Sequence, residues 1–127
     1  MSRRRKYIKV SFQKEGIHKF PGAKDLPGVE FLQYPHRHMF HFYVTLQVRH
    51  DDREVEFILF KRELENLYTE HALELDNQSC EMMAEGLINY IEDNYPKRAV
   101  KVEVYEDNEN GAVVHNDLFN RPWVCRN

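Results

Sequence analysis

The most informative segment of the sequence reads Pro35-His36-Arg37-His38-Met39-Phe40-His41-Phe42-Tyr43-Val44-Thr45-Leu46-Gln47-Val48. Side chains in a β-strand point alternately to its two faces. One face would therefore carry two histidines followed by five apolar residues, namely His36, His38, Phe40, Phe42, Val44, Leu46 and Val48. A buried strand face rarely begins with two histidines. We predict a strand from residue 36 to about residue 49 that presents an imidazole pair on its buried face.

The histidine pair has two interpretations. Its two members would point the same way, about 6–7 Å apart along the strand, and could bind one metal ion if a third ligand came from elsewhere. Alternatively, both imidazoles lie half-exposed at a strand end and bond to backbone or water. The spacing alone does not decide between them.

Length and composition describe a soluble protein of one domain, residues 1–127, with 42% hydrophobic and 31% charged residues. The net charge of −3 argues against nucleic-acid binding, and the basic extension over residues 1–6 is typical of a solvated terminus. Two cysteines, Cys80 and Cys125, have no framework spacing, which fits a reducing compartment. No apolar run is long enough to span a membrane, so we expect a cytoplasmic protein without a membrane partner.

The first half of the chain reads as strands. We predict a strand over residues 7–12, an ordered loop over 21–35 that holds three prolines and two glycines, and then the histidine strand. Residues 50–53 form a polar turn, and residues 54–60 are predicted to return as a third strand, so that the pair makes a hairpin.

In the second half of the chain, the apolar residues recur with the period of a helix instead of a strand. One helix is predicted from the stripe Phe60, Leu64, Leu67 and His71, followed by a polar break over residues 74–79 that holds several candidate N-caps. A second helix carries an apolar side and stops before Pro96. Strands are predicted over 99–106 and 112–115, while the tail over 116–127 has no usable periodicity.

The element order is therefore strand, strand, strand, helix, helix, strand, strand. It predicts an α+β fold in which an antiparallel sheet carries both helices on one face. The second face would then need cover from another subunit, so we expect self-association.

Glu106 interrupts an apolar pattern, because it shares a strand face with Val100, Val102 and Val104. A buried ionised carboxylate is costly unless it is paired or hydrogen-bonded. Glu106 either lies solvated just past the strand end or anchors a ligand by accepting two parallel N–H bonds from a guanidine-like edge.

These features together resemble the family of 6-pyruvoyl tetrahydropterin synthase and 6-carboxytetrahydropterin synthase. Residues 15–21 are similar to the end of its phenylalanine-rich strand, Ala-Ala-His-x-Leu, and His36-Arg37-His38 is similar to its His-Gly-His with arginine for glycine. Residues 77–81 resemble its Asn-Pro-Thr-Ser-Glu, and residues 102–106 resemble its last glutamate-bearing strand. The four segments occur in the family's order and span about residues 7–115.

The resemblance implies the tunnelling fold, assembled into a multi-subunit barrel with sites between subunits, here expected as a homohexamer. It implies that His18, His36 and His38 bind Zn²⁺ and leave a fourth position open, as in catalytic zinc sites. Glu106 would hold the ring of a pterin or purine-like ligand. Glu70-His71 resembles the family's Asp-His pair, whose histidine supports acid–base chemistry; the apolar stripe alone would instead make His71 a packed core residue.

One position departs from the family. Its catalytic cysteine lies four residues before the paired histidines, where this chain has Leu32, and neither cysteine of the chain aligns with that position. One branch of the family uses a nearby glutamate, and Glu30 lies two residues away. The first hypothesis is therefore a zinc-dependent lyase of pterin or deazapurine pathways that acts on dihydroneopterin triphosphate or a relative. The alternatives are a non-catalytic zinc protein that binds pterins or purines, and an oligomeric interaction protein with a structural histidine cluster.

Overall fold

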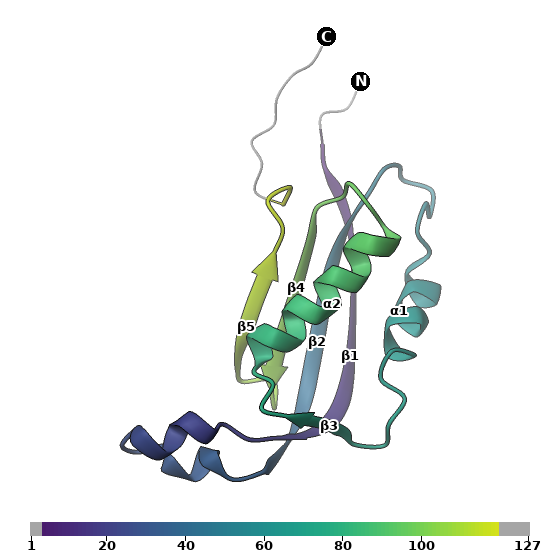
Figure 1. Ribbon diagram of the computed structural model, residues 1–127. Helices are drawn as coiled ribbons and strands as arrows, with labels where there is room; N and C mark the ends of the chain where they lie inside the picture. Colours follow the sequence, from purple (N-terminus) through teal and green to yellow (C-terminus); the bar gives the residue numbers. More distant parts are fainter. Residues whose placement is uncertain (1–3, 120–127) are drawn as a thin grey trace.

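The computed structural model describes residues 4–119, and within them five strands form one mixed sheet (Figure 1). The strands are β1 (Lys6–His18), β2 (His36–Val48), β3 (Leu73–Asp76), β4 (Val100–Glu106) and β5 (Asn110–His115). Across the sheet they lie in the order β3-β1-β2-β4-β5. Helix α1 (Phe57–Glu65) follows β2, and helix α2 (Cys80–Asn94) follows β3. The chain is thus an α+β protein.

Strand β2 lies in the middle of this sheet and supplies much of the core. The alternation predicted from the sequence is confirmed, because Phe40, Phe42, Val44 and Leu46 are fully buried while their neighbours on the strand are partly exposed. Strand β1 pairs with it antiparallel in a continuous register, in which Phe12 faces Phe42 and their rings stack at a centroid distance of 4.7 Å.

Strand β1 is longer than the predicted strand over residues 7–12. It continues to His18, which pairs with His36 at the other end of the register. Lys14, Glu15 and Gly16 break the local alternation of apolar residues, so the sequence pattern ends early. The backbone pairing with β2 nevertheless carries the strand through them.

The predicted third strand over residues 54–60 is wrong. A helix, α1, begins at Phe57, because the Glu56 carboxylate accepts hydrogen bonds from the backbone N–H groups of Ile58 and Leu59. Phe60 and Leu64, spaced by four residues, form its buried side. The helix ends at Glu65, so the predicted stripe does not continue to Leu67 and His71 as helix, and the expected hairpin does not form.

A third strand does exist, but it overlaps the start of the polar break predicted over residues 74–79. Residues Leu73–Asp76 form β3, which runs parallel to β1 next to Gly16 and Ile17. The sheet is therefore mixed rather than purely antiparallel, and the order becomes β-β-α-β-α-β-β. Only Leu73 and Leu75 are buried in this four-residue strand, which is too short for its alternation to be detected in the sequence.

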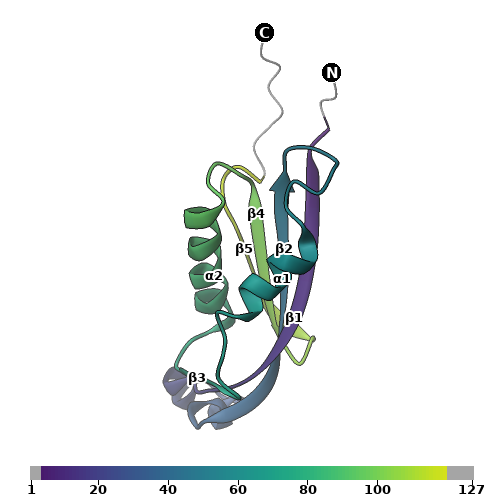
Figure 2. The ribbon, with the colours of Figure 1, turned by 90° about the vertical axis from the view of Figure 1, so that its right-hand side faces the viewer.

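Helix α2 agrees with the prediction. Ser79 caps it by accepting from the Met82 backbone N–H at 3.1 Å, and it ends before Pro96. Figure 2 shows α2 along one side of the sheet. The buried side chains of both helices belong to the same core cluster as one sheet face. Within residues 4–119, neither helix combines the length and apolar character that a membrane span requires.

The opposite face of the sheet is mostly polar and aromatic, although Met39 and Val113 on this face are 38% and 51% exposed. Its residues include Lys9, Gln13, Arg37, Tyr43 and Lys101, and the Tyr43 ring packs against Tyr105 at 5.7 Å. The expected need to cover an apolar second face therefore does not arise from these residues.

Between β1 and β2, residues 19–35 form an arm that extends beyond the end of the sheet (Figure 1). It holds two short 3-10 helices, Pro21–Asp25 and Glu30–Gln33. Ala23 is buried inside the arm, whereas several large apolar side chains are exposed: Phe20, Leu26, Phe31 and Tyr34. The ordered loop predicted over residues 21–35 corresponds to this arm.

An ion pair between Glu54 and Arg98 joins the segment before α1 to the segment before β4. Both guanidinium NH groups donate to the carboxylate, at 2.7 and 2.6 Å, and the two side chains are only 17% and 9% exposed. The Arg98 guanidinium holds the pKa of the Glu54 carboxyl at about 2, below its ordinary 4.5. The charged pair contributes to stability above pH 4.5 and less as the pH falls toward 2.

We expect Glu54→Gln to lower the free energy of unfolding by about 3 kcal/mol, because Arg98 is left buried without its counter-charge. Urea unfolding at pH 7 measures the change. The control is Asp52→Asn, which removes an ion pair to Arg53 at the surface and should leave the midpoint nearly unchanged. Equal midpoints for both variants would show that the Glu54–Arg98 pair contributes nothing net.

Candidate metal centre

Three histidines meet where β1 and β2 pair at the base of the arm. His18 ends β1, and His36 and His38 begin β2 on the face that continues into the core. The His18 ring centroid lies 4.6 Å from that of His36 and 5.5 Å from that of His38, and the latter two are 5.0 Å apart. The structure therefore brings the two predicted strand histidines and the third, His18, into one cluster.

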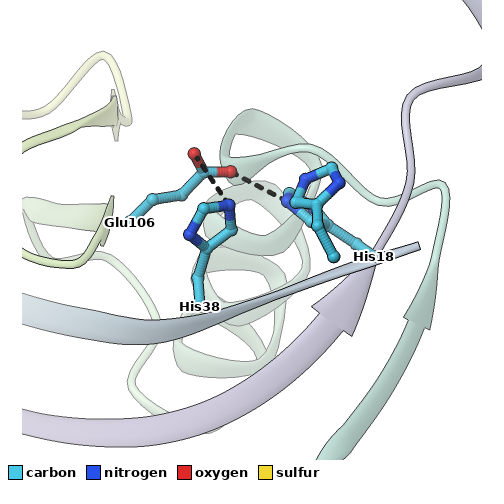
Figure 3. Close-up of side chains that lie close together, drawn as sticks. His18, His38 and Glu106 are labelled. Atoms are coloured by element: carbon cyan, nitrogen blue, oxygen red, sulfur yellow. Dashed lines mark ion pairs between the residues drawn. The ribbon is translucent and has the colours of Figure 1, made fainter. Parts of the chain in front are cut away.

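Glu106 joins this cluster from the end of β4, where it pairs with Phe40 of β2 (Figure 3). One carboxylate oxygen lies 2.9 Å from His18 Nε2, and the other lies 3.6 Å from His38 Nε2. One potential ligand atom from each of the four residues lies within 4.8 Å of the other three. The group could hold a metal ion. With its carboxylate the group offers four potential donors, one more than the three histidines alone.

The outer nitrogens of the rings are already engaged. His18 Nδ1 lies 2.8 Å from the Gln78 carbonyl, and His36 Nδ1 lies 2.8 Å from the Tyr34 carbonyl. His38 Nδ1 lies 2.7 Å from the Asp107 carboxylate. Because carbonyl oxygens only accept hydrogen bonds, Nδ1 of His18 and His36 must carry the proton. Metal-binding histidines are typically held in this way, with the other nitrogen left as the ligand.

The inner nitrogens lack hydrogen bonds. His18 is 7% exposed, and its Nε2 is buried without a hydrogen-bond partner, because the Glu106 oxygen 2.9 Å away and a ring nitrogen without a proton are both acceptors. His38 Nε2 is also buried without a hydrogen-bond partner. Buried polar atoms without partners are costly, and few occur in folded proteins. A metal ion between these nitrogens would satisfy both, so the residues fit a metal ion chemically.

The donor set consists of imidazole nitrogens and one carboxylate oxygen, which suits zinc and also other first-row divalent metals. In a tetrahedral zinc site, bonds of about 2.0–2.1 Å hold the donors about 3.3 Å apart. In this structure His18 Nε2 lies closer than that to one Glu106 oxygen, at 2.9 Å, and His38 Nε2 lies slightly farther from the other, at 3.6 Å.

Asp107 is a residue of this centre that the sequence analysis missed. It follows Glu106 in the turn between β4 and β5 and adopts a positive φ of 52°, a conformation that aspartate tolerates better than most residues. Its carboxylate accepts from the Met39 backbone N–H at 3.0 Å and contacts His38. These two contacts, with the Met39 N–H first, lower the pKa of Asp107. The sequence offered one sign of this role: Asp107 is an acidic residue that directly follows Glu106, the glutamate at the end of the predicted strand.

Arginine at position 37, where the resembling family has glycine, does not disturb the cluster. Its side chain lies on the other face of β2 and pairs with Glu15 at 2.7 Å. Gly16 does have a steric role: a Cβ there would approach Leu75 Cδ1 to 2.8 Å and the Phe40 ring to 3.0 Å. This close packing lies directly beneath the histidines.

A cavity of about 490 Å³ adjoins the cluster. His18, His36 and Glu106 line it from the sheet, Phe20 and Leu32 line it from the arm, and the start of α2 closes another side. Ligand pockets commonly have volumes of this order. The cavity opens onto three of the four residues of the cluster.

The predicted catalytic residues, which stay a prediction, are not among the side chains that line this cavity. Glu30 is exposed on the arm, and its carboxylate accepts from the Gly28 backbone N–H. Glu70 and His71 are exposed in the segment between α1 and β3 and do not line the cavity. Leu32, at the position of the family's cysteine, does line it.

Fold and site together define an α+β protein with a candidate centre of three histidines and one glutamate. No family model and no curated protein sequence matches the chain. Among solved structures, the crystal structure of the uncharacterized protein WS1659 from Wolinella succinogenes is similar at a TM-score of 0.47 and 14% identity. The match covers 87% of this chain and 99% of that one. Similarity at this level assigns the chain neither a family nor a function.

We expect Asp107→Asn to weaken zinc binding about 10- to 100-fold, because the carboxylate that orients His38 loses its charge. His38→Ala should release most of the metal. Competition against a chromophoric chelator measures the affinity, and elemental analysis measures the content.

Glu109→Gln is the matched control, since it removes a carboxylate from the same turn without a described contact to the cluster. If Asp107→Asn and Glu109→Gln bind zinc equally well, Asp107 has no role in the centre. If His38→Ala retains the wild-type zinc content after reconstitution, these residues do not form a metal centre.

Proposed function

We propose that this protein binds zinc through His18, His36, His38 and Glu106 and uses it on a small molecule in the adjoining cavity. The observation that carries this proposal is the pair of buried Nε2 atoms without hydrogen bonds, which face one carboxylate. When bound, zinc would act as a Lewis acid that polarises oxygen atoms of the ligand and acidifies the neighbouring C–H groups.

More specifically, we propose that the protein is a lyase similar to 6-pyruvoyl or 6-carboxytetrahydropterin synthase, which acts on dihydroneopterin triphosphate or a relative. It is supported by the four sequence segments that resemble that family. Two of them, around His18 and His36–His38, supply the clustered histidines, and the other two supply Glu106 and the start of α2, which borders the cavity.

Glu106 has two proposed roles that compete for the same oxygens. As the resemblance implies, it would accept hydrogen bonds from a pterin or guanine-like edge. In the structure both of its oxygens face histidine Nε2 atoms instead. We propose that Glu106 is a metal ligand in the resting protein and that ring recognition requires its carboxylate to turn into the cavity.

The second candidate is a zinc protein that binds a pterin or purine without converting it. It is favoured by Leu32, which lines the cavity and cannot transfer a proton, and by Glu30 and His71, which are exposed and do not line the cavity. The lyase hypothesis would need Glu70 and His71 from a neighbouring copy, consistent with sites between subunits.

We expect the zinc-loaded protein to bind neopterin in a calorimeter and Glu106→Gln to bind it at least about tenfold more weakly, since a charge-assisted pair is lost. Zinc content must be measured in the same samples. If Glu106→Gln keeps its full zinc content but binds pterin more weakly, Glu106 contacts the pterin ring. If the variant loses zinc, Glu106 is a metal ligand.

Glu103→Gln, which changes a carboxylate on the other face of β4, is the control. Turnover of dihydroneopterin triphosphate by the wild-type protein separates the lyase from the binding protein. Absence of any pterin or purine binding by zinc-loaded protein would refute both hypotheses and leave an interaction protein with a structural histidine cluster.

We expect the chain to self-associate, as a homohexamer by family resemblance. The physical motive is the exposed apolar side chains of the arm and of the start of α1, where Phe31, Phe57 and Leu59 are 66%, 54% and 63% exposed. Light scattering coupled to gel filtration at micromolar concentration should report several chains per particle. Phe31→Ser should reduce the mass, whereas Lys24→Ser in the same arm should not. A wild-type mass of one chain would rule out the oligomer.

A further inference from the structure

Three consecutive apolar side chains are exposed at the start of α1. Phe57, Ile58 and Leu59 are 54%, 51% and 63% exposed, although the next residue, Phe60, is buried in the core. The first turn of the helix is therefore apolar toward the core and also toward the surface. Single exposed apolar residues are normal, whereas contiguous ones mark interaction sites. We call these three residues the α1 apolar surface.

The chain beside this surface is more basic than the protein as a whole. A cleft of about 250 Å³ is lined by Phe57 from α1 and by Lys6, the first residue of β1. Lys6 is also the last residue of the basic run over residues 3–6. Residues 3–6 and 49–57 together hold six basic and four acidic residues, whereas the whole chain holds 18 basic and 21 acidic residues. Positive charge is therefore concentrated beside the α1 apolar surface.

The acidic side chains of this region have partners within the protein. Three of them form ion pairs, and the fourth caps α1 by accepting from backbone N–H groups. The pairs are Asp51–Lys6, Asp52–Arg53 and Glu54–Arg98, and the capping residue is Glu56. One turn further along the helix, Arg62 is exposed and lies on the same side as Ile58, four residues before it. It adds a cation to the rim of the apolar surface.

Exposed apolar side chains also occur on the arm, but their surroundings differ. Residues 19–35 hold two basic and two acidic residues, so the arm has no excess of either charge. An apolar surface without excess charge suits a protein partner such as a second copy of the chain. The α1 apolar surface, next to an excess of positive charge, suits a partner that is anionic at its surface and apolar within. A bilayer with anionic headgroups has this chemistry.

We propose that the α1 apolar surface attaches this protein to the surface of an anionic phospholipid membrane. The three apolar side chains enter the boundary between headgroups and acyl chains, while Arg62 and the basic residues at the start of the chain are attracted to the lipid phosphates. The attachment is peripheral. It is separate from the candidate metal centre, because the cleft adjoins the first residue of β1 and His18 is the last. It replaces the expectation that the protein has no membrane partner.

Cosedimentation with phospholipid vesicles tests the attachment. The full chain is mixed with phosphatidylcholine vesicles that either contain phosphatidylserine or lack it. We expect at least about tenfold stronger binding to the phosphatidylserine vesicles, and loss of most of this binding at high salt. Leu59→Ser should weaken the binding about tenfold, because the membrane no longer buries a leucine side chain. Arg62→Gln should weaken it about fivefold, since one cation near the headgroups is lost.

The controls change similar residues elsewhere in the chain. Leu67→Ser replaces a leucine that is 42% exposed beyond the other end of α1, and Lys24→Gln removes an exposed cation from the arm. Both variants should bind vesicles as the wild type does. Light scattering should give Leu59→Ser the wild-type mass. A Leu59→Ser protein with fewer chains per particle would place Leu59 in a subunit interface and overturn the proposal.

Two further results would contradict membrane attachment. Equal binding to both kinds of vesicle, or binding to neither, would show that anionic lipid is not the partner. Binding to a single-stranded oligonucleotide without binding to vesicles would assign the basic residues to nucleic acid and overturn the proposal as well.

Discussion

The antiparallel register between β1 and β2 is the constraint on which the rest of the structure depends. It places His18 opposite His36 and, six residues earlier along β1, Phe12 opposite Phe42. Because side chains alternate along a strand, a slip of one residue would move the phenylalanines out of the core and the histidines to the polar face together. The stacked rings and the close approach of Phe40 and Leu75 to Gly16 oppose such a slip. The same packing that stabilises the fold therefore positions the candidate centre.

Strand β4 adds a carboxylate to what would otherwise be a histidine cluster. Glu106 continues the buried face of Val100, Val102 and Val104, and the turn that follows returns Asp107 to His38. The histidine rings therefore contact acceptors at both nitrogens. The Nδ1 atoms contact two carbonyls and the Asp107 carboxylate, and the Nε2 atoms of His18 and His38 face Glu106. Leaving two imidazole nitrogens buried without hydrogen bonds costs stability. A metal ion bound between them would remove that cost.

Much of this arrangement could be predicted from sequence because it depends on short-range alternation. The buried face of β2, the caps and end of α2, and the place of Glu106 on its strand follow from period and from residue type. The strand predicted over residues 54–60 was wrong, because apolar residues at that spacing suit a strand or a helix and the Glu56 cap selects the helix. Strand β3 was missed because its pairing with β1 is a long-range contact between four residues and a distant strand. Gln78 and Tyr34 contribute only carbonyl oxygens to the centre, and any residue type could supply those.

The arm over residues 19–35 begins directly after His18 and ends directly before His36, so its two ends meet at the candidate centre. A metal ion bound there would close this loop chemically, in the manner of a cross-link. Closing a loop removes conformational freedom from the unfolded chain and so stabilises the folded one. Metal occupancy and arm order would then be thermodynamically linked. Because the exposed aromatic side chains of the arm lie on this loop, an ion bound at the centre would also favour the positions in which they are presented to a partner.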